Sequence, residues 1–155
     1  MATIEEGIEV DVPLTTAYNQ WTQFESFPRF MEGVESVTQV TDTRNHWVAE
    51  IAGVTREFDT EITEQHPDER IAWCTLDGPK QAGVVTFHRI TDGTTKVMLQ
   101  MAFEPEGFAE KAGDVLGIVK ARVKGDLGRF KEFIESRGVE EGGWRGEVDR
   151  VDRTG

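Results

Sequence analysis

The sequence predicts an α+β domain in which a curved antiparallel sheet of about seven strands is covered by one long C-terminal helix. Three observations predict it. Short segments with alternating apolar and polar residues fill the middle of the chain, which is typical of strands that bury one face. Two short stretches with helical features follow the first such segment. A single apolar stripe with helical spacing lies near the C-terminus, and the economical packing lays that helix across the concave face of the sheet.

The N-terminal part predicts one strand and two short helices. In residues 3–12 apolar side chains fall mainly at even positions, and Pro13 ends the strand. The next segment, up to Phe24, carries apolar side chains three and four residues apart, which predicts a helix with one apolar face. Pro28 suits the first turn of a second helix over residues 28–31, which ends at Gly33.

The middle of the chain, from Val34 to Phe103, predicts about six antiparallel strands joined by turns. The strongest turn signal is Asp92-Gly93, which lies between two alternating segments and predicts a tight hairpin. Residues 42–45 also have the composition of a turn. Pro105 and Gly107 are expected to stop the last strand.

From about Phe108 the apolar period changes to that of a helix. Gly138 is expected to close this helix. Residues 1–138 therefore form a single predicted domain. Residues 139–155 are polar and rich in glycine and charge, and we expect them to be a loose tail. The apolar stripe of the helix consists of Ala112, Leu116, Val119, Val123, Leu127, Phe130 and Ile134.

Composition narrows the classes of function. A chain of 155 residues is long enough to bury a core. It has no apolar run of the length that spans a membrane, its N-terminus is acidic, and Cys74 is its only cysteine, so we expect a cytoplasmic protein without an internal disulfide. The net charge of -12 repels phosphate backbones, which argues against a nucleic-acid partner.

The segment 25–34, ESFPRFMEGV, concentrates apolar side chains in what first looks like a connector. The order of strand, helices and sheet predicts that these side chains belong to the two short helices and close one end of the sheet. A membrane-binding foot is therefore disfavoured. Phe27, Phe30 and Met31 either seal the core or form a gate to an interior space.

Two motifs carry a resemblance to a known family. The first is V-P-x-x-x-x-Y-x-x-W, from Val12 to Trp21, and the second is F-P-x-F-M, from Phe27 to Met31. With GVVTFHRI, TKVMLQMAFEP and DLGRFKEFIESRG, they make the chain similar to the SRPBCC superfamily over nearly its whole length up to Arg137. This is the helix-grip fold of START domains and birch-pollen allergens, and the bacterial polyketide cyclase/dehydrase-like group resembles the chain most.

The resemblance implies a deep, mostly apolar cavity between the sheet and the long helix. Characterised relatives bind polyketides, lipids, steroids, hormones or quinones. The alternation of apolar residues along the strands and the helical stripe supply candidate walls for such a cavity, although the same residues would equally fill a core. The candidate wall residues are Trp47, Phe58, Trp73, Phe87, Leu99, Met101, Phe103, Val119 and Val123.

Catalytic residues are not identified by any motif. Arg122 lies at the edge of the apolar stripe and is included as a candidate ligand-binding residue, and Arg56 lies on the strand face of Phe58. Each could polarise a ligand or form a surface ion pair. The three histidines and Cys74 show no spacing typical of a metal site or a nucleophile, so no metal and no cofactor is expected.

The first functional hypothesis is therefore the binding of an apolar or aromatic small molecule, as a carrier or sensor. The lipid, polyketide and quinone-like ligands of relatives define its class. The second hypothesis is a polyketide cyclase, aromatase or dehydratase that acts in the same cavity. The third is a protein-interaction or chaperone-like module, and a homodimer also remains open.

Overall fold

The computed structural model describes residues 2–51, 53–77, 80–104 and 115–148. One antiparallel sheet of seven strands has the order β1-β7-β6-β5-β4-β3-β2. This arrangement confirms the predicted sheet. The strands are β1 (Ala2–Val10), β2 (Val34–Gln39), β3 (Arg44–Ile51), β4 (Val54–His66), β5 (Arg70–Thr75), β6 (Gln81–Thr91) and β7 (Thr94–Phe103).

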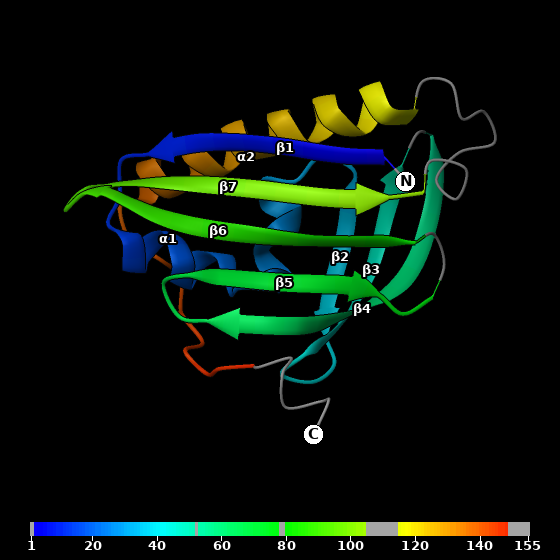
Figure 1. Cartoon of the computed structure of the whole chain (residues 1–155), viewed down its shortest axis with the longest axis horizontal. Coiled ribbons are helices and arrows are strands. Elements are labelled where there is room, and N and C mark those ends of the chain that lie inside the picture. Colours follow the sequence, from blue (N-terminus) through cyan, green and yellow to red (C-terminus); the bar gives the residue numbers. More distant parts are fainter. Residues whose placement is uncertain (1, 52, 78–79, 105–114, 149–155) are drawn as a thin grey trace.

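The sheet curves so strongly that β2 and β3 turn away from the direction of β1, β7 and β6 (Figure 1). Sharp hairpins join neighbouring strands of this sheet. Gly53 has a φ of +83° between β3 and β4, a conformation that favours glycine. The predicted hairpin at Asp92-Gly93 joins β6 to β7, where Thr91 pairs with Thr94. The two ends of the sheet thus form the walls of a concave face.

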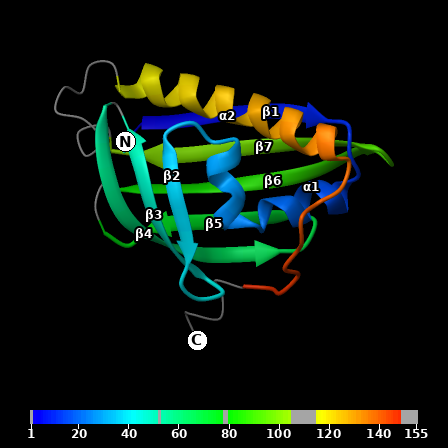
Figure 2. The same ribbon diagram turned by 180° about the vertical axis from the view of Figure 1, so that it is seen from behind.

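The long helix α2 (Val115–Arg137) lies across this concave face, as expected (Figure 2). Its buried side chains, from Val119 to Ile134, follow the apolar stripe and face the sheet. Gly138 closes the helix with a φ of +75° and donates its N–H to the carbonyl of Ile134 at 2.8 Å. The expected helix start at Phe108 and the expected strand stops at Pro105 and Gly107 lie outside the described residues.

The first short helix, α1 (Leu14–Trp21), agrees with the prediction, but the second differs from it. It is a 3₁₀ helix, η1 (Phe24–Arg29), that begins four residues before Pro28. Pro28 lacks the backbone N–H that a longer α-helix would need at this position, whereas 3₁₀ helices occur as short pieces. Phe24 and Phe27 on η1 are buried, so the aromatic segment points inward as predicted.

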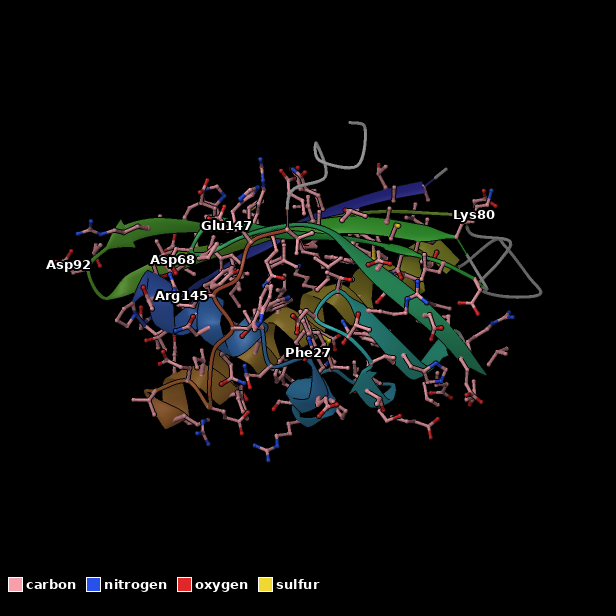
Figure 3. All side chains as sticks on the ribbon, turned by 90° about the horizontal axis from the view of Figure 1, so that it is seen from below. Phe27, Asp68, Lys80, Asp92, Arg145 and Glu147 are labelled. Carbon is pink, nitrogen blue, oxygen red and sulfur yellow. The ribbon has the colours of Figure 1, made fainter. Side chains whose placement is uncertain are left out.

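The segment 139–148 also differs from the loose tail that the sequence predicts. Buried Gln20 of α1 exchanges two hydrogen bonds with Glu141, at 3.0 and 2.8 Å. Arg145 pairs with Asp68 at 2.9 Å, and the two residues lie side by side in Figure 3. Val148 forms a β-bridge with Gln65. Residues 139–148 thus cover α1 and β4, whereas the domain boundary at residue 138 stays a prediction.

None of the helices in the described part of the chain is long and apolar enough to cross a membrane.

Candidate functional site

A cavity of about 180 Å³ lies between the concave face of the sheet, η1 and α2. One water molecule needs only about 10–15 Å³ on the same measure, so the cavity has room for a larger ligand. Phe27 of η1 lies on the side of the sheet that α2 also covers (Figure 3). Ile118 of α2 lines the cavity and is 41% exposed, so the cavity reaches the surface beside α2.

The walls of the cavity are mainly aromatic and aliphatic. Trp47 of β3 stacks on Phe58 of β4, with ring centroids 6.1 Å apart and planes within 6°. Phe27 contacts the other side of this wall, with its centroid 5.7 Å from that of Trp47. Trp73 and Met101 extend the wall along β5 and β7. Such a surface binds apolar groups by removing them from water.

Alternation along the strands explains why these side chains meet. Trp47 and Phe58 are direct partners across β3 and β4, so their side chains lie on one face. Gly83 pairs with both Trp73 and Met101. A Cβ atom at Gly83 would lie only 2.6 Å from the Trp73 ring, so glycine leaves room for the indole against β6. The sequence therefore places a bulky ring at the cavity wall.

Neutral polar side chains lie at one end of this wall. Asn45 of β3 and Thr60 of β4 pair across the two strands, line the cavity, and are only 2% and 3% exposed. The Thr60 hydroxyl accepts a hydrogen bond from Trp47 Nε1 at 2.9 Å. Asn45 Oδ1 is buried and has no hydrogen-bond partner among the described residues. Most buried polar groups in proteins are paired, so this amide is a notable exception.

Charged side chains lie at the other end, near the surface. Arg122 of α2 donates to the carbonyl oxygens of Glu32 and Glu50 at 3.0 and 2.9 Å. Asp126 accepts the Glu32 N–H at 3.0 Å and also pairs with Arg129. Burial raises the pKa of the Asp126 carboxyl above its usual value, while the Arg129 guanidinium opposes this rise. We call Glu32, Glu50, Arg122 and Asp126, which all line the cavity, the charged rim. Glu50 contributes its carbonyl oxygen, because it alternates with Ala49 on β3 and its side chain lies on the opposite face of the sheet.

Most of the predicted ligand-binding residues line the cavity, although whether they bind a ligand stays a prediction. Two do not line it. Phe87 is 5.4 Å from Tyr18 and 6.3 Å from Trp21, both of α1, because α1 covers that part of β6. Phe103 is buried at the end of β7, where it pairs with Ala2 and Gln81. The predicted ligand-binding residues that do line the cavity are Trp47, Phe58, Trp73, Leu99, Met101, Val119, Arg122 and Val123.

The three residues that the sequence predicts as a possible gate also differ in position. Phe27 and Met31 line the cavity, so a gate built from these two stays a prediction. Phe30 does not line it, and its ring packs at 5.3 Å on both Phe130 and Phe133 of α2. Phe30 therefore fills the core between η1 and α2.

Arg56, the second candidate arginine, is not part of the cavity lining, and its Nε is buried without a hydrogen-bond partner among the described residues.

Sequence reasoning missed several lining residues. The sequence predicts a turn at Asn45, but this residue belongs to β3. It lies two residues before Trp47 and therefore shares its face, a signal that the alternation itself contains. Asp126 and Ile118 are neighbours of stripe positions on α2. Glu32 and Glu50 carry no signal in the sequence, because only the fold brings them to Arg122.

Groups that could hold a metal ion do not assemble in the described part of the chain: no three His, Cys, Asp or Glu side chains are placed for it. His46 contacts Asp59 and Glu57 at 2.6 and 3.1 Å. These residues alternate with the cavity-lining residues of β3 and β4, so they lie on the opposite face of the sheet. Cys74 is a partly exposed free thiol.

Comparison with known proteins agrees with this architecture. The family model described as "Polyketide cyclase / dehydrase and lipid transport" matches residues 10–132. The chain is also 64% identical over 149 residues to an uncharacterized 17.2 kDa protein of Streptomyces lincolnensis. The alignment covers 96% of this chain and 99% of that relative.

Solved structures show the same fold at low sequence identity. The Zhui aromatase/cyclase from a Streptomyces species has a TM-score of 0.76 at 16% identity, over 92% of this chain and 99% of that one. A START superfamily protein from Mycobacterium smegmatis has a TM-score of 0.67 at 17% identity, over 87% and 95%. These structures support the helix-grip fold alone. The family match over residues 10–132 shows that the chain belongs to the polyketide cyclase/dehydrase and lipid-transport family.

Proposed function

We propose that this protein binds an apolar or aromatic small molecule in the cavity between the sheet and α2, as a carrier or sensor. The observation that carries the proposal is the cavity of about 180 Å³, whose walls are built mainly from aromatic and aliphatic side chains. Lipid-, polyketide- and quinone-like molecules have the apolar surface that such walls remove from water. Family membership supports the same class of ligand.

The aromatic walls favour a ligand with a flat or flexible apolar body. Trp47, Phe58 and Trp73 present ring faces or edges from three adjacent strands. Val119 and Val123 of α2 oppose them with smaller side chains. A ligand between the two layers would contact rings on one side and methyl groups on the other, which suits aromatic and alkyl groups.

Native mass spectrometry of the protein purified from its own host tests this proposal. We expect a co-purified small molecule that is released when the protein unfolds. Val119→Phe is expected to reduce the bound fraction at least about tenfold, because the larger ring occupies the cavity. Ala121→Phe is the matched control, because Ala121 is exposed on the same helix and does not line the cavity. A ligand-free wild type that also fails to bind added aromatic and lipid-like compounds would overturn the proposal.

A cyclase, aromatase or dehydratase is the second candidate, and the charged rim favours it. Arg122 and Asp126 lie at the cavity, and the raised pKa of Asp126 is a feature that proton-transfer groups share. A carrier returns its ligand unchanged, whereas a cyclase returns a product with a new ring bond. Incubation with a poly-β-ketone substrate, followed by product analysis, separates the two. Turnover that Asp126→Asn abolishes, while binding persists, would establish the enzyme.

A further inference from the structure

We propose that the ligand carries an uncharged hydroxyl group at its inner end, which donates a hydrogen bond to Asn45 and accepts one from Thr60. This inference rests on the proposed binding function and specifies the class of ligand, namely a neutral phenol or alcohol with an apolar body. Three features of the cavity carry it: a buried amide without a partner, a hydroxyl with a spare donor, and the separation of these groups from the charged rim.

The first feature is the Asn45 amide. Its side chain is 2% exposed and lines the cavity, and its Oδ1 has no hydrogen-bond partner in the described part of the chain. A buried acceptor without a partner is costly, because it has lost its hydrogen bonds to water. A ligand that donates to this oxygen therefore gains affinity that a hydrocarbon of the same shape does not.

The second feature is the Thr60 hydroxyl. Its oxygen accepts from Trp47 Nε1 at 2.9 Å, and this bond leaves its own O–H free to donate, since no described residue accepts from it. Thr60 pairs directly with Asn45 across β3 and β4, so the two side chains are neighbours on the cavity wall. An acceptor and a donor side by side match a hydroxyl group, which both donates and accepts.

The third feature is the distribution of charge. Asn45 and Glu50 are five residues apart on β3, about 17 Å at the usual rise of a strand. The neutral pair is almost fully buried, whereas the Glu32 side chain of the charged rim is 69% exposed. At the rim the Arg122 guanidinium donates to the backbone carbonyl oxygens of Glu32 and Glu50, and Asp126 pairs with Arg129. A neutral hydroxyl fits the uncharged inner end, whereas a carboxylate there would be buried with no cationic partner among the described residues that line that end.

Binding of four matched bicyclic compounds tests the inference by isothermal titration calorimetry. These are naphthalene, 2-naphthol, 2-methoxynaphthalene and 2-naphthoate. We expect 2-naphthol to bind about five- to tenfold more tightly than naphthalene, the difference that one net hydrogen bond provides. The methoxy compound lacks the donor and is expected to lose most of this advantage. The naphthoate is expected to bind more weakly than 2-naphthol.

Variants test whether Asn45 and Thr60 cause the preference for 2-naphthol over naphthalene. Asn45→Leu is expected to bind naphthalene as the wild type does, or more tightly, and to lose the preference for 2-naphthol. Thr60→Val is expected to reduce that preference in part. His46→Leu is the matched control, because His46 is next to Asn45 but on the opposite face of the sheet. The comparison of the four compounds on wild-type protein needs no variant, so it stands even if a variant does not fold.

Different results would overturn the hydroxyl anchor and the proposed binding function. Equal affinity of the wild type for naphthalene and 2-naphthol would overturn the hydroxyl anchor but leave the proposed function intact. A preference for 2-naphthol that survives unchanged in Asn45→Leu would also overturn it. If none of the four compounds binds, the result counts against the proposed function itself, and the inference falls with it.

Discussion

The two halves of the concave face are built from the same kinds of residue, yet one is filled and the other is hollow. In the filled half, the rings of Tyr18 and Phe87 pack together, those of Phe30 and Phe130 do the same, and all four residues are at most 5% exposed. In the hollow half, Trp47, Phe58, Trp73, Met101 and Val119 surround the cavity of about 180 Å³.

The difference between the halves comes from what covers them. α1 lies over the filled half, where Tyr18 and Trp21 reach Phe87 of β6. Over the hollow half the cover is η1 and the N-terminal part of α2, where the short side chains of Val119 and Val123 face the rings of the sheet and leave space between the layers. Similar alternation along the strands therefore produces a core or a cavity according to which side chains pack opposite it.

The largest change in the free energy of unfolding is expected from a substitution in the filled half. Phe130 is fully buried and packs 4.9 Å from Trp21 and 5.3 Å from Phe30. Phe130→Ala is expected to lower the free energy of unfolding by about 3–5 kcal/mol. Phe58→Ala in the hollow half is expected to cost at least about 1 kcal/mol less, because one side of Phe58 already faces the cavity. Urea denaturation measures both, and equal losses would contradict the contrast between the halves.

Removal of residues 139–155 is expected to weaken the filled half selectively. The deletion removes the bonds of Glu141 to Gln20 and of the Trp144 N–H to the Thr22 hydroxyl. We expect a loss of about 1–3 kcal/mol in unfolding free energy and no change in the affinity for naphthalene. The control is a chain that ends at Val148. A deletion that leaves stability unchanged would show that residues 139–148 are loosely held, as the sequence predicts.

A substitution at Gly83 is expected to alter the hollow half. A Cβ atom there would lie 2.6 Å from the Trp73 ring and 2.9 Å from the Gln100 carbonyl oxygen, so the indole at the cavity wall must move. Gly83→Ala is expected to reduce the affinity for naphthalene about tenfold, a change of about 1.4 kcal/mol. Gly93→Ala, where a Cβ meets no atom within 4 Å, is the control. Wild-type affinity in Gly83→Ala would exclude Trp73 from the binding wall.

The smallest change in stability is expected from His46 on the outer face of the sheet, which belongs to neither half of the concave face. Hydrogen bonds to Asp59 and Glu57 raise the pKa of His46. Because the folded-state pKa exceeds the unfolded value, the stabilisation is complete below about pH 6.5 and is lost as pH rises through the folded pKa. Both side chains are more than a third exposed, so solvent screening limits the pair to about 0.2–1 kcal/mol.

Thermal unfolding of wild type and His46→Gln between pH 5 and pH 9 measures this contribution. The two proteins are expected to differ most at the acidic end and to converge at the alkaline end. A difference that grows with pH would contradict the sign. Ligand affinity is expected to be the same in both proteins, because His46 lies on the face of the sheet opposite the cavity.

Much of this architecture follows from the sequence, because strand alternation and the helical stripe are local patterns. They correctly place Trp47, Phe58 and Val119 on the inner face. The same pattern cannot separate Phe58 from Phe87, since only the position of α1 decides which of them faces a cavity. Asn45 was missed for a different reason: a polar residue beside a turn has the composition of the turn, whatever face it occupies.

Methionine methyl groups offer the most direct test that the hollow half is a ligand site. Met31 and Met101 line the cavity, whereas Met98 lies on the opposite face of β7, beside Gly7. Methyl-¹³C methionine spectra are recorded while naphthalene is added. We expect the Met31 and Met101 signals to shift in a saturable manner and the Met98 signal to stay in place. Unchanged signals at Met31 and Met101, or an equal shift at Met98, would contradict binding in the cavity.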